Sequence, residues 1–257
     1  MGAYDMKEKS CFERFPTRIN IYHFINEVRA YLFPGHFEKV SGNLECYKTK
    51  KIKRISKLFR KYICYKPENL KGFIESLPSL KEALDKDLDF FFESDPASES
   101  KDEIILAYPG FLAITYYRIA HILNGLHIDI VPRLITELAH SETGIDIHPA
   151  CSIGVPFFID HGTGIVIGET REIGNFVKMY HGVTLGALSL KEGRSLENKK
   201  RHPTIKDYVT IYSGASILGG ETIIEDRAVI GSNVFIVNSV VKDTKVIYSQ
   251  DSIKISK

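Results

Sequence analysis

The sequence has little cysteine and no spacing that would pair it. Its four cysteines, Cys11, Cys46, Cys64 and Cys151, are scattered and form no CxxC pair. This usage favours reduced thiols in a cytoplasmic protein over a disulfide framework. Residues 1–14 are charged and lack an apolar core of signal-peptide length, so we expect no export.

Long apolar runs and an excess of charge of one sign are also missing. The most apolar stretch, residues 104–123, is interrupted by Pro109 and Gly110 and carries Arg118 and His121, which favours a buried helix over a membrane span. Lys and Arg number 34 against 32 Asp and Glu, a net charge of +2. This balance gives no general reason to expect nucleic acid or a membrane as a partner.

Apolar residues recur at helical spacing up to about residue 140. One such series consists of Ile19, Tyr22, Ile25 and Val28. The basic stretch at residues 48–61 would suit an anionic partner, but charges of this kind are usually one solvated helix face. The sequence therefore predicts an α-helical N-terminal domain over residues 1–140.

The period changes to six from Ile147 onward. An aliphatic residue opens each of thirteen units: Ile147, Ile153, Ile159, Ile165, Ile173, Met179, Leu185, Ile205, Ile211, Ile217, Ile224, Ile230 and Ile236. The register slips by two residues before Ile173 and by one before Ile224, and a polar insertion over residues 188–204 interrupts it. A short strand and a turn repeated every six residues predict a hexapeptide β-helix over residues 141–257, ending in a short tail.

Several short motifs lie within, beside and upstream of the repeats. They are DPA at 95–97, YRIAH at 117–121, DIHPA at 146–150, DHGTG at 160–164, GET at 168–170, GVTLG at 182–186, KRHP at 200–203 and ILGG at 217–220. Together they resemble the serine acetyltransferase family of hexapeptide-repeat acyltransferases, over roughly residues 95–241. The resemblance implies three units per turn and a left-handed β-helix, so the fold class is α+β with about four turns of helix.

A β-helix of this kind has no internal pocket, so its sites must form on outer walls or between neighbouring copies. The resemblance accordingly implies a homotrimer or a dimer of trimers. It also implies that acetyl-CoA lies in the groove between adjacent prisms, near backbone donors of Gly186, Ala187 and Ser213. The insertion, with Gly193 as a hinge, either covers this groove, reaches the nucleotide phosphates, or is an idle loop.

Acetylation of an alcohol needs a base, and histidine is the usual choice because its pKa lies near 7. His161 is the candidate. We expect Asp146 on the same wall, one turn below His161, where a carboxylate would stabilise the imidazolium. A histidine beside an aspartate is more often structural, and it is the resemblance that favours a catalytic pair.

The acceptor that the resemblance implies, L-serine, is a zwitterion. Its ammonium requires carboxylates, for which Asp95 and Asp160 are suited, and its carboxylate requires forked cationic donors, for which Arg201 and His202 are suited. Without the resemblance, Asp95 before Pro96 would be interpreted as a turn or helix cap. Glu169 either supports these groups or is a solvent-facing turn residue.

Two positions depart from the family pattern. His181 stands where the family usually has glutamine or another uncharged residue, and stacked on His161 it would suit a zinc site like that of the β-helix carbonic anhydrases. No third histidine has ligand spacing, so we expect no metal. The C-terminal tail ends in Lys257, whereas some family members dock into cysteine synthase through a terminal isoleucine, so a complex with cysteine synthase stays open.

The leading hypothesis is a cytoplasmic serine O-acetyltransferase that makes O-acetyl-L-serine for cysteine biosynthesis, with L-cysteine as a competing inhibitor. A related acyltransferase acting on a sugar or antibiotic hydroxyl is an alternative, and it would have no use for Asp95 and Arg201. A non-catalytic scaffold is a third hypothesis, which the presence of Asp146, His161, Arg201 and His202 disfavours.

Overall fold

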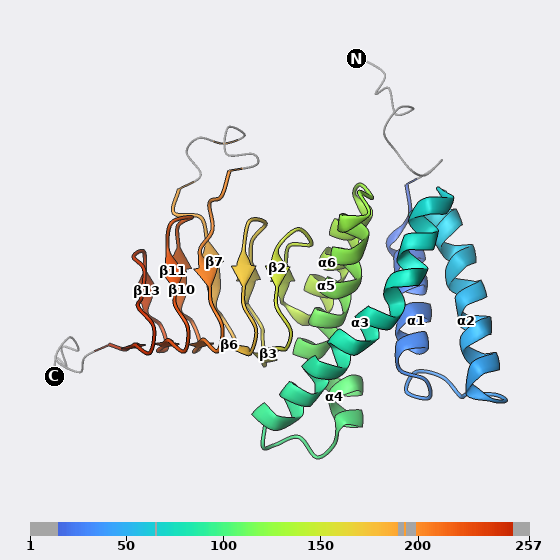
Figure 1. Cartoon of the computed structure of the whole chain (residues 1–257), viewed down its shortest axis with the longest axis horizontal. Coiled ribbons are helices and arrows are strands. Elements are labelled where there is room, and N and C mark those ends of the chain that lie inside the picture. The colour runs from blue at the N-terminus through green and yellow to red at the C-terminus, as the bar shows by residue number, and fades with distance from the viewer. Residues whose placement is uncertain (1–14, 65, 190–192, 194–198, 249–257) are drawn as a thin grey trace.

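The helices lie at one end of the molecule and the strands at the other (Figure 1). The computed structural model describes residues 15–64, 66–189, 193 and 199–248. Within these residues the helices are α1 (Arg18–Leu32), α2 (Leu44–Leu58), the π-helical turn η1 (Phe59–Ile63), α3 (Pro67–Ser94), α4 (Lys101–Ala107), α5 (Pro109–Gly125) and α6 (Val131–Thr143). None of these helices is long and apolar enough to span a membrane.

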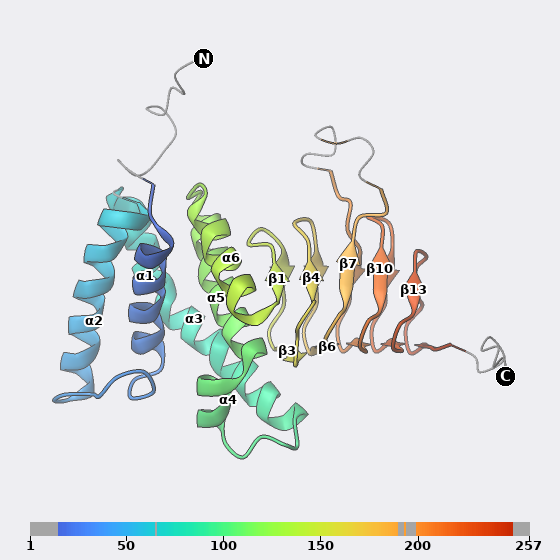
Figure 2. The same ribbon diagram turned by 180° about the vertical axis from the view of Figure 1, so that it is seen from behind.

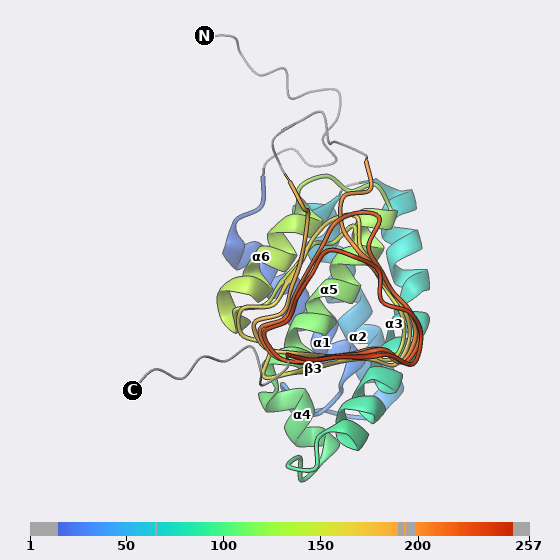
Figure 3. The same ribbon diagram turned by 90° about the vertical axis from the view of Figure 1, so that its left-hand side faces the viewer.

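The strands form three parallel walls around a triangular cross-section (Figure 3). The first wall consists of β1 (Asp146–Ile147), β4 (Val166–Ile167), β7 (Thr184–Gly186), β10 (Ser216–Leu218) and β13 (Phe235–Ile236). The second wall consists of β2 (Ser152–Ile153), β5 (Glu172–Ile173), β8 (Thr204–Ile205) and β11 (Ile223–Ile224). The third wall consists of β3 (Phe157–Asp160), β6 (Val177–Tyr180), β9 (Thr210–Ile211), β12 (Val229–Ile230) and β14 (Lys245–Val246).

The chain therefore passes from an α-helical region into a left-handed parallel β-helix, which confirms the predicted fold class. Strand numbers within each wall differ by three up to β13, because three short strands complete one turn. The last step of the third wall, from β12 to β14, differs by two, because Val240 makes only an isolated bridge in the second wall. The opening aliphatic of each hexad points inward and is buried, as Ile153, Met179 and Ile217 illustrate. Each turn thus adds apolar side chains to one continuous core.

Two details of the predicted repeat are wrong. Ile147 pairs with Ile167 and not with Ile165, so the two-residue slip lies at the corner 161–164 and precedes Ile167. The extra residues are accommodated by left-handed backbone, with φ of 54° at His161 and 86° at Gly162. Sequence spacing alone misplaced the slip because Ile165 is also fully buried.

The β-helix is also longer than the predicted four turns and approaches five. Beyond Ile236, Val240 bridges to Ile224, and β14 pairs with β12. The predicted tail therefore begins inside the prism. Residues 249–257 lie outside the described residues, as do Cys11 and most of the insertion. Cys46 is exposed and Cys151 is buried, and neither is part of a disulfide.

Helix α6 leads into the first strand of the β-helix, and α5 packs against its first turn (Figure 2). The Tyr117 hydroxyl donates to the carbonyl of Cys151 at 2.8 Å and accepts from the Ile153 N–H at 3.1 Å. The Arg118 guanidinium donates to the Gly154 carbonyl at 2.9 Å. The YRIAH motif thus satisfies backbone groups at the open end of the prism, which would otherwise be buried without partners.

Candidate functional site

The predicted site residues gather at two corners of the prism, on opposite edges of the first wall. The corner between the third and first walls, here called the base corner, carries Asp160 and His161. Asp95, at the end of α3, lies near this corner, since the charges of Asp95 and Asp160 both act on Tyr108 and Tyr180. The corner between the first and second walls carries Glu169, Arg201 and His202. Within one chain, the proposed base and the proposed carboxylate clamp are therefore separated by the width of a wall.

His161 follows β3 and projects from the base corner. Its side chain is 75% exposed, and its Nε2 lies 3.6 Å from Oδ1 of Asp160. The His181 ring stands one turn above it, edge to face, with 5.9 Å between ring centroids. An exposed imidazole beside a carboxylate can accept a proton from a bound hydroxyl.

Asp95 caps the C-terminus of α3 and also faces the base corner. Its Oδ1 accepts the N–H of Ala97 at 2.8 Å, and its Oδ2 accepts the Tyr108 hydroxyl at 2.7 Å. This hydrogen bond, with burial and the charges of Asp95 and Asp160, raises the pKa of Tyr108. The interpretation of Asp95 as a helix cap is thus correct, and the same carboxylate is still available to hold an ammonium beside Asp160.

The second corner contains a pocket of about 290 Å³, here called the arginine pocket. It is lined by Arg133, Asp146, His148, Ile167, Gly168, Glu169, Arg201 and His202. Arg201 forms an ion pair with Glu169, which lowers the pKa of that carboxyl. Burial and the Arg133 charge lower the pKa of His148. Two guanidinium groups and two imidazoles around one pocket are suited to binding a carboxylate.

Asp146 belongs to the arginine pocket, so the prediction that it shares a wall with His161 is wrong. Asp146 lies on the first wall and pairs with Val166, twenty residues later, whereas β3 before His161 is in the third wall. Its Oδ1 accepts from Arg133 Nη1 at 3.1 Å. Fifteen residues are too few to complete a turn of twenty, so the two residues cannot stack within one chain.

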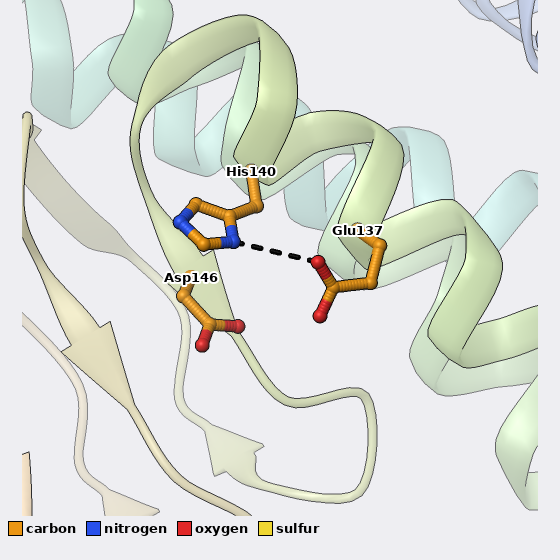
Figure 4. A group of neighbouring side chains, drawn as sticks. All are labelled: Glu137, His140 and Asp146. Carbon is orange, nitrogen blue, oxygen red and sulfur yellow. Dashed lines mark ion pairs between the residues drawn. The ribbon is translucent and has the colours of Figure 1, made fainter.

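Asp146 also lies in a group of three side chains that could in principle hold a metal (Figure 4). One ligand atom from each of Glu137, His140 and Asp146 lies within 4.8 Å of the others, and His140 Nδ1 is 3.5 Å from Glu137. Arg133 pairs with both carboxylates, so its guanidinium already supplies the positive charge that a metal would bring. This donor set gives no case for a metal centre.

The residues proposed for acetyl-CoA are divided between the two corners. Ser213 stacks above His181 at the base corner, because the Gly214 N–H donates to the His181 carbonyl at 2.9 Å. Gly186 ends β7 at the far edge of the first wall, and Ala187 follows it. Of the predicted site residues, the structure therefore brings together Asp95, Asp160 and His161 at one corner, and Asp146, Glu169, Arg201 and His202 at the other.

Sequence inspection assigned no role to three residues that the structure places in these groups. Tyr108 binds Asp95, Arg133 binds Asp146, and His148 lines the arginine pocket. His148 lies inside the DIHPA motif, so the motif could have indicated that it belongs to the site. Tyr108 and Arg133 come from the helical region, where no repeat indicates which residues face the prism.

Comparison with known proteins gives consistent results, although no protein-family model matches the chain. A plasmid-encoded serine acetyltransferase of Synechococcus elongatus is 47% identical over 176 residues, which cover 67% of this chain and 55% of that protein. The serine acetyltransferase of Helicobacter pylori is 42% identical over 151 residues, covering 59% of this chain and 84% of that protein. The chain spans 55% to 62% of the length of three curated relatives that it matches.

Among solved structures, the chain is similar to serine acetyltransferase 1 of Entamoeba histolytica, crystallised in complex with L-cysteine. The two share 35% sequence identity with a TM-score of 0.77, and the match covers 91% of this chain and 88% of that one. It therefore includes the helical region as well as the β-helix.

Proposed function

Since the chain belongs to the serine acetyltransferase family, we propose that it transfers the acetyl group of acetyl-CoA to the hydroxyl of L-serine. The products are O-acetyl-L-serine and CoA, in the first step of cysteine biosynthesis. The observation that carries the proposal is the division of charge between the corners. Carboxylates stand beside an exposed histidine at one corner and an arginine pocket lies at the other, which together match an amino-acid zwitterion.

The reaction is a direct transfer without an acetyl-enzyme. His161 takes the hydroxyl proton as the serine oxygen attacks the thioester carbonyl, and the imidazolium then returns the proton to the departing thiolate of CoA. Cys151 is unsuited to act as a nucleophile, because it lies inside the prism and burial raises the pKa of its thiol to about 12. Asp95 and Asp160 hold the serine ammonium, and Arg201 and His202 hold its carboxylate.

The division of the site over two edges of one wall favours an assembly in which two copies complete each site. In a ring of three, the base corner of one copy meets the arginine pocket of the next, which is a heterologous and closed contact. A homotrimer, or two trimers joined through their helical regions, satisfies this requirement. Acetyl-CoA then lies in the groove between the copies.

An acceptor screen tests the activity itself. The purified chain is supplied with acetyl-CoA and a thiol reagent that reports free CoA, with L-serine, other amino acids, sugars and aminoglycosides offered in turn. CoA release with L-serine alone is the expected result. Release only with a sugar or antibiotic would support the alternative acyltransferase, and no release with any acceptor would support a scaffold.

Mixed assemblies test the shared site. His161→Ala and Arg201→Ala chains are each expected to be almost inactive, but an equal mixture unfolded and refolded together should recover about a quarter of the wild-type sites. Each site needs an intact His161 from one copy, with probability one half, and an intact Arg201 from the next, with the same probability. If the activity of the refolded mixture is no greater than the summed activities of the two separate variants, each site is built within one chain.

L-Cysteine is expected to inhibit competitively against L-serine, because it differs only by a thiol in place of the hydroxyl. The crystal structure of the Entamoeba histolytica relative with L-cysteine supports this expectation. The measurement is the apparent KM for serine at several cysteine concentrations, with L-alanine as the matched control that lacks the thiol. An unchanged rate at low serine would remove this form of feedback.

A cytoplasmic location is proposed from the scattered cysteines, and any docking to cysteine synthase through residues 249–257 stays a hypothesis.

A further inference from the structure

His202 is held in one defined orientation by Thr170. The backbone N–H of Thr170 donates to His202 Nδ1 at 3.1 Å, and the Thr170 hydroxyl lies 2.8 Å from the same nitrogen. A ring nitrogen that accepts a backbone N–H cannot carry a proton. The proton of the neutral imidazole is therefore on Nε2, and the backbone geometry fixes the tautomer.

The opposite edge of the ring fits against Gly168. A Cβ added to Gly168 would lie 2.5 Å from His202 Nε2 and 2.7 Å from Cε1. Gly168 is not among the glycines with a positive φ, so its backbone conformation does not require glycine. Glycine is needed at this position because a larger residue would clash with the His202 ring. With only 8% of the residue exposed, the ring presents its Nε2 edge beside Gly168 in the arginine pocket.

The same threonine also holds the neighbouring arginine. The N–H of Arg201 donates to the Thr170 hydroxyl oxygen at 3.1 Å. One hydroxyl thus donates to the ring of His202 and accepts from the backbone of Arg201. This single side chain therefore contacts both residues that we propose to bind the substrate carboxylate.

The surroundings keep the imidazole neutral. The charged and titratable groups that act on it are Arg171, Arg201, Glu169 and His148. Burial, followed by the two guanidinium charges, lowers the pKa of His202 to about 4. His202 is therefore an uncharged donor throughout the neutral pH range, and Arg201 supplies the positive charge.

We propose that Thr170, together with Gly168, is a positioning residue that fixes His202 as an Nε2–H donor beside Arg201 for the substrate carboxylate. The carboxylate is then bound by one cation and one neutral, pre-oriented donor, and little reorganisation accompanies binding. This inference rests on the proposed function and adds to it a specific role for the GET motif.

The first test compares Thr170→Val, which removes the hydroxyl at nearly constant volume, with Thr170→Ser, which keeps it. Thr170→Val should raise the KM for L-serine about 5- to 100-fold, the range for a buried hydrogen bond left unmade, with the KM for acetyl-CoA unchanged. Thr170→Ser should stay within about threefold of wild type. Thr210→Val is the matched control, since Thr210 is also half-buried in the β-helix but lies on the third wall. Equal KM values for Thr170→Val and Thr170→Ser would overturn the proposal.

The second test does not depend on the Thr170 variants folding. The Kd of L-serine is measured for wild type and for His202→Gln, whose amide can replace an Nε2–H donor, at pH 6.0 and 8.0. For a neutral donor the ratio of the two Kd values is the same at both pH values, because all other titrations cancel. A ratio that grows about tenfold at the lower pH would show a cationic His202 and overturn the proposal. Failure of the unmodified chain to acetylate serine would instead overturn the proposed function, on which this inference rests.

Discussion

The His161→Ala variant is expected to have a kcat about 10² to 10⁴ times lower than wild type, with acetyl-CoA affinity nearly unchanged. A positioned general base contributes about this much, and removing it leaves the proposed acetyl-CoA groove intact. His161 is well suited to the role because its exposed ring stands at the base corner, with its Nε2 3.6 Å from Oδ1 of Asp160. Initial rates with saturating serine and a direct acetyl-CoA binding measurement separate the two effects.

His127→Ala is the matched control for this experiment. His127 is likewise an exposed histidine with a φ of 54°, but it lies between α5 and α6, away from both corners. Its replacement should leave kcat within about twofold, as is usual for surface substitutions. Full activity in His161→Ala would defeat the scheme. So would an acetylated protein detected by mass spectrometry when acetyl-CoA is supplied without serine, because direct transfer forms no such species.

The β-helix was predictable because each hexad must bury its own aliphatic side chain. The six-residue repeat is therefore visible in the sequence as a regular recurrence of aliphatic residues. Ile147, Ile153 and Ile159 follow this rule in successive walls. The same rule misplaced the register where the chain departs from it. Two extra residues are inserted at the corner 161–164, and Ile165 fills interior space without being the paired strand residue.

The sequence indicated which residues to consider for the site, but not which of them lie together. The motifs singled out His161, Asp146 and Arg201, and the structure places each of them in a charged cluster, but which of them face one another depends on the number of residues in a turn. A turn of twenty residues places Asp146 under Val166, and a turn of fifteen would have placed it under His161. Partners from the helical region, such as Arg133 and Tyr108, follow only from the packing of that region on the prism.

The buried ion pair between Asp87 and Arg118 is expected to have the largest effect on stability. Asp87 is fully buried in α3, and its two carboxylate oxygens lie 2.5 and 2.8 Å from Nε and Nη2 of Arg118 in α5. Removing one partner, as in Arg118→Met or Asp87→Leu, leaves an uncompensated charge and should lower the free energy of unfolding by about 3 to 5 kcal/mol. Equilibrium urea unfolding measures the change.

The double variant Asp87→Leu/Arg118→Met should cost clearly less than the sum of the two single variants. It leaves no buried charge, although the Phe157 N–H and the Gly154 carbonyl lose the partners that now lie at 3.0 and 2.9 Å. Arg227→Met is the matched control. It breaks a similar two-point contact with Asp243, at 2.6 and 2.9 Å, that is exposed, so little change is expected. Additive single effects would mean that the two side chains stabilise the junction independently. Strong coupling would mean that they act as one unit, through which α3 and α5 hold the first turn of the prism in place.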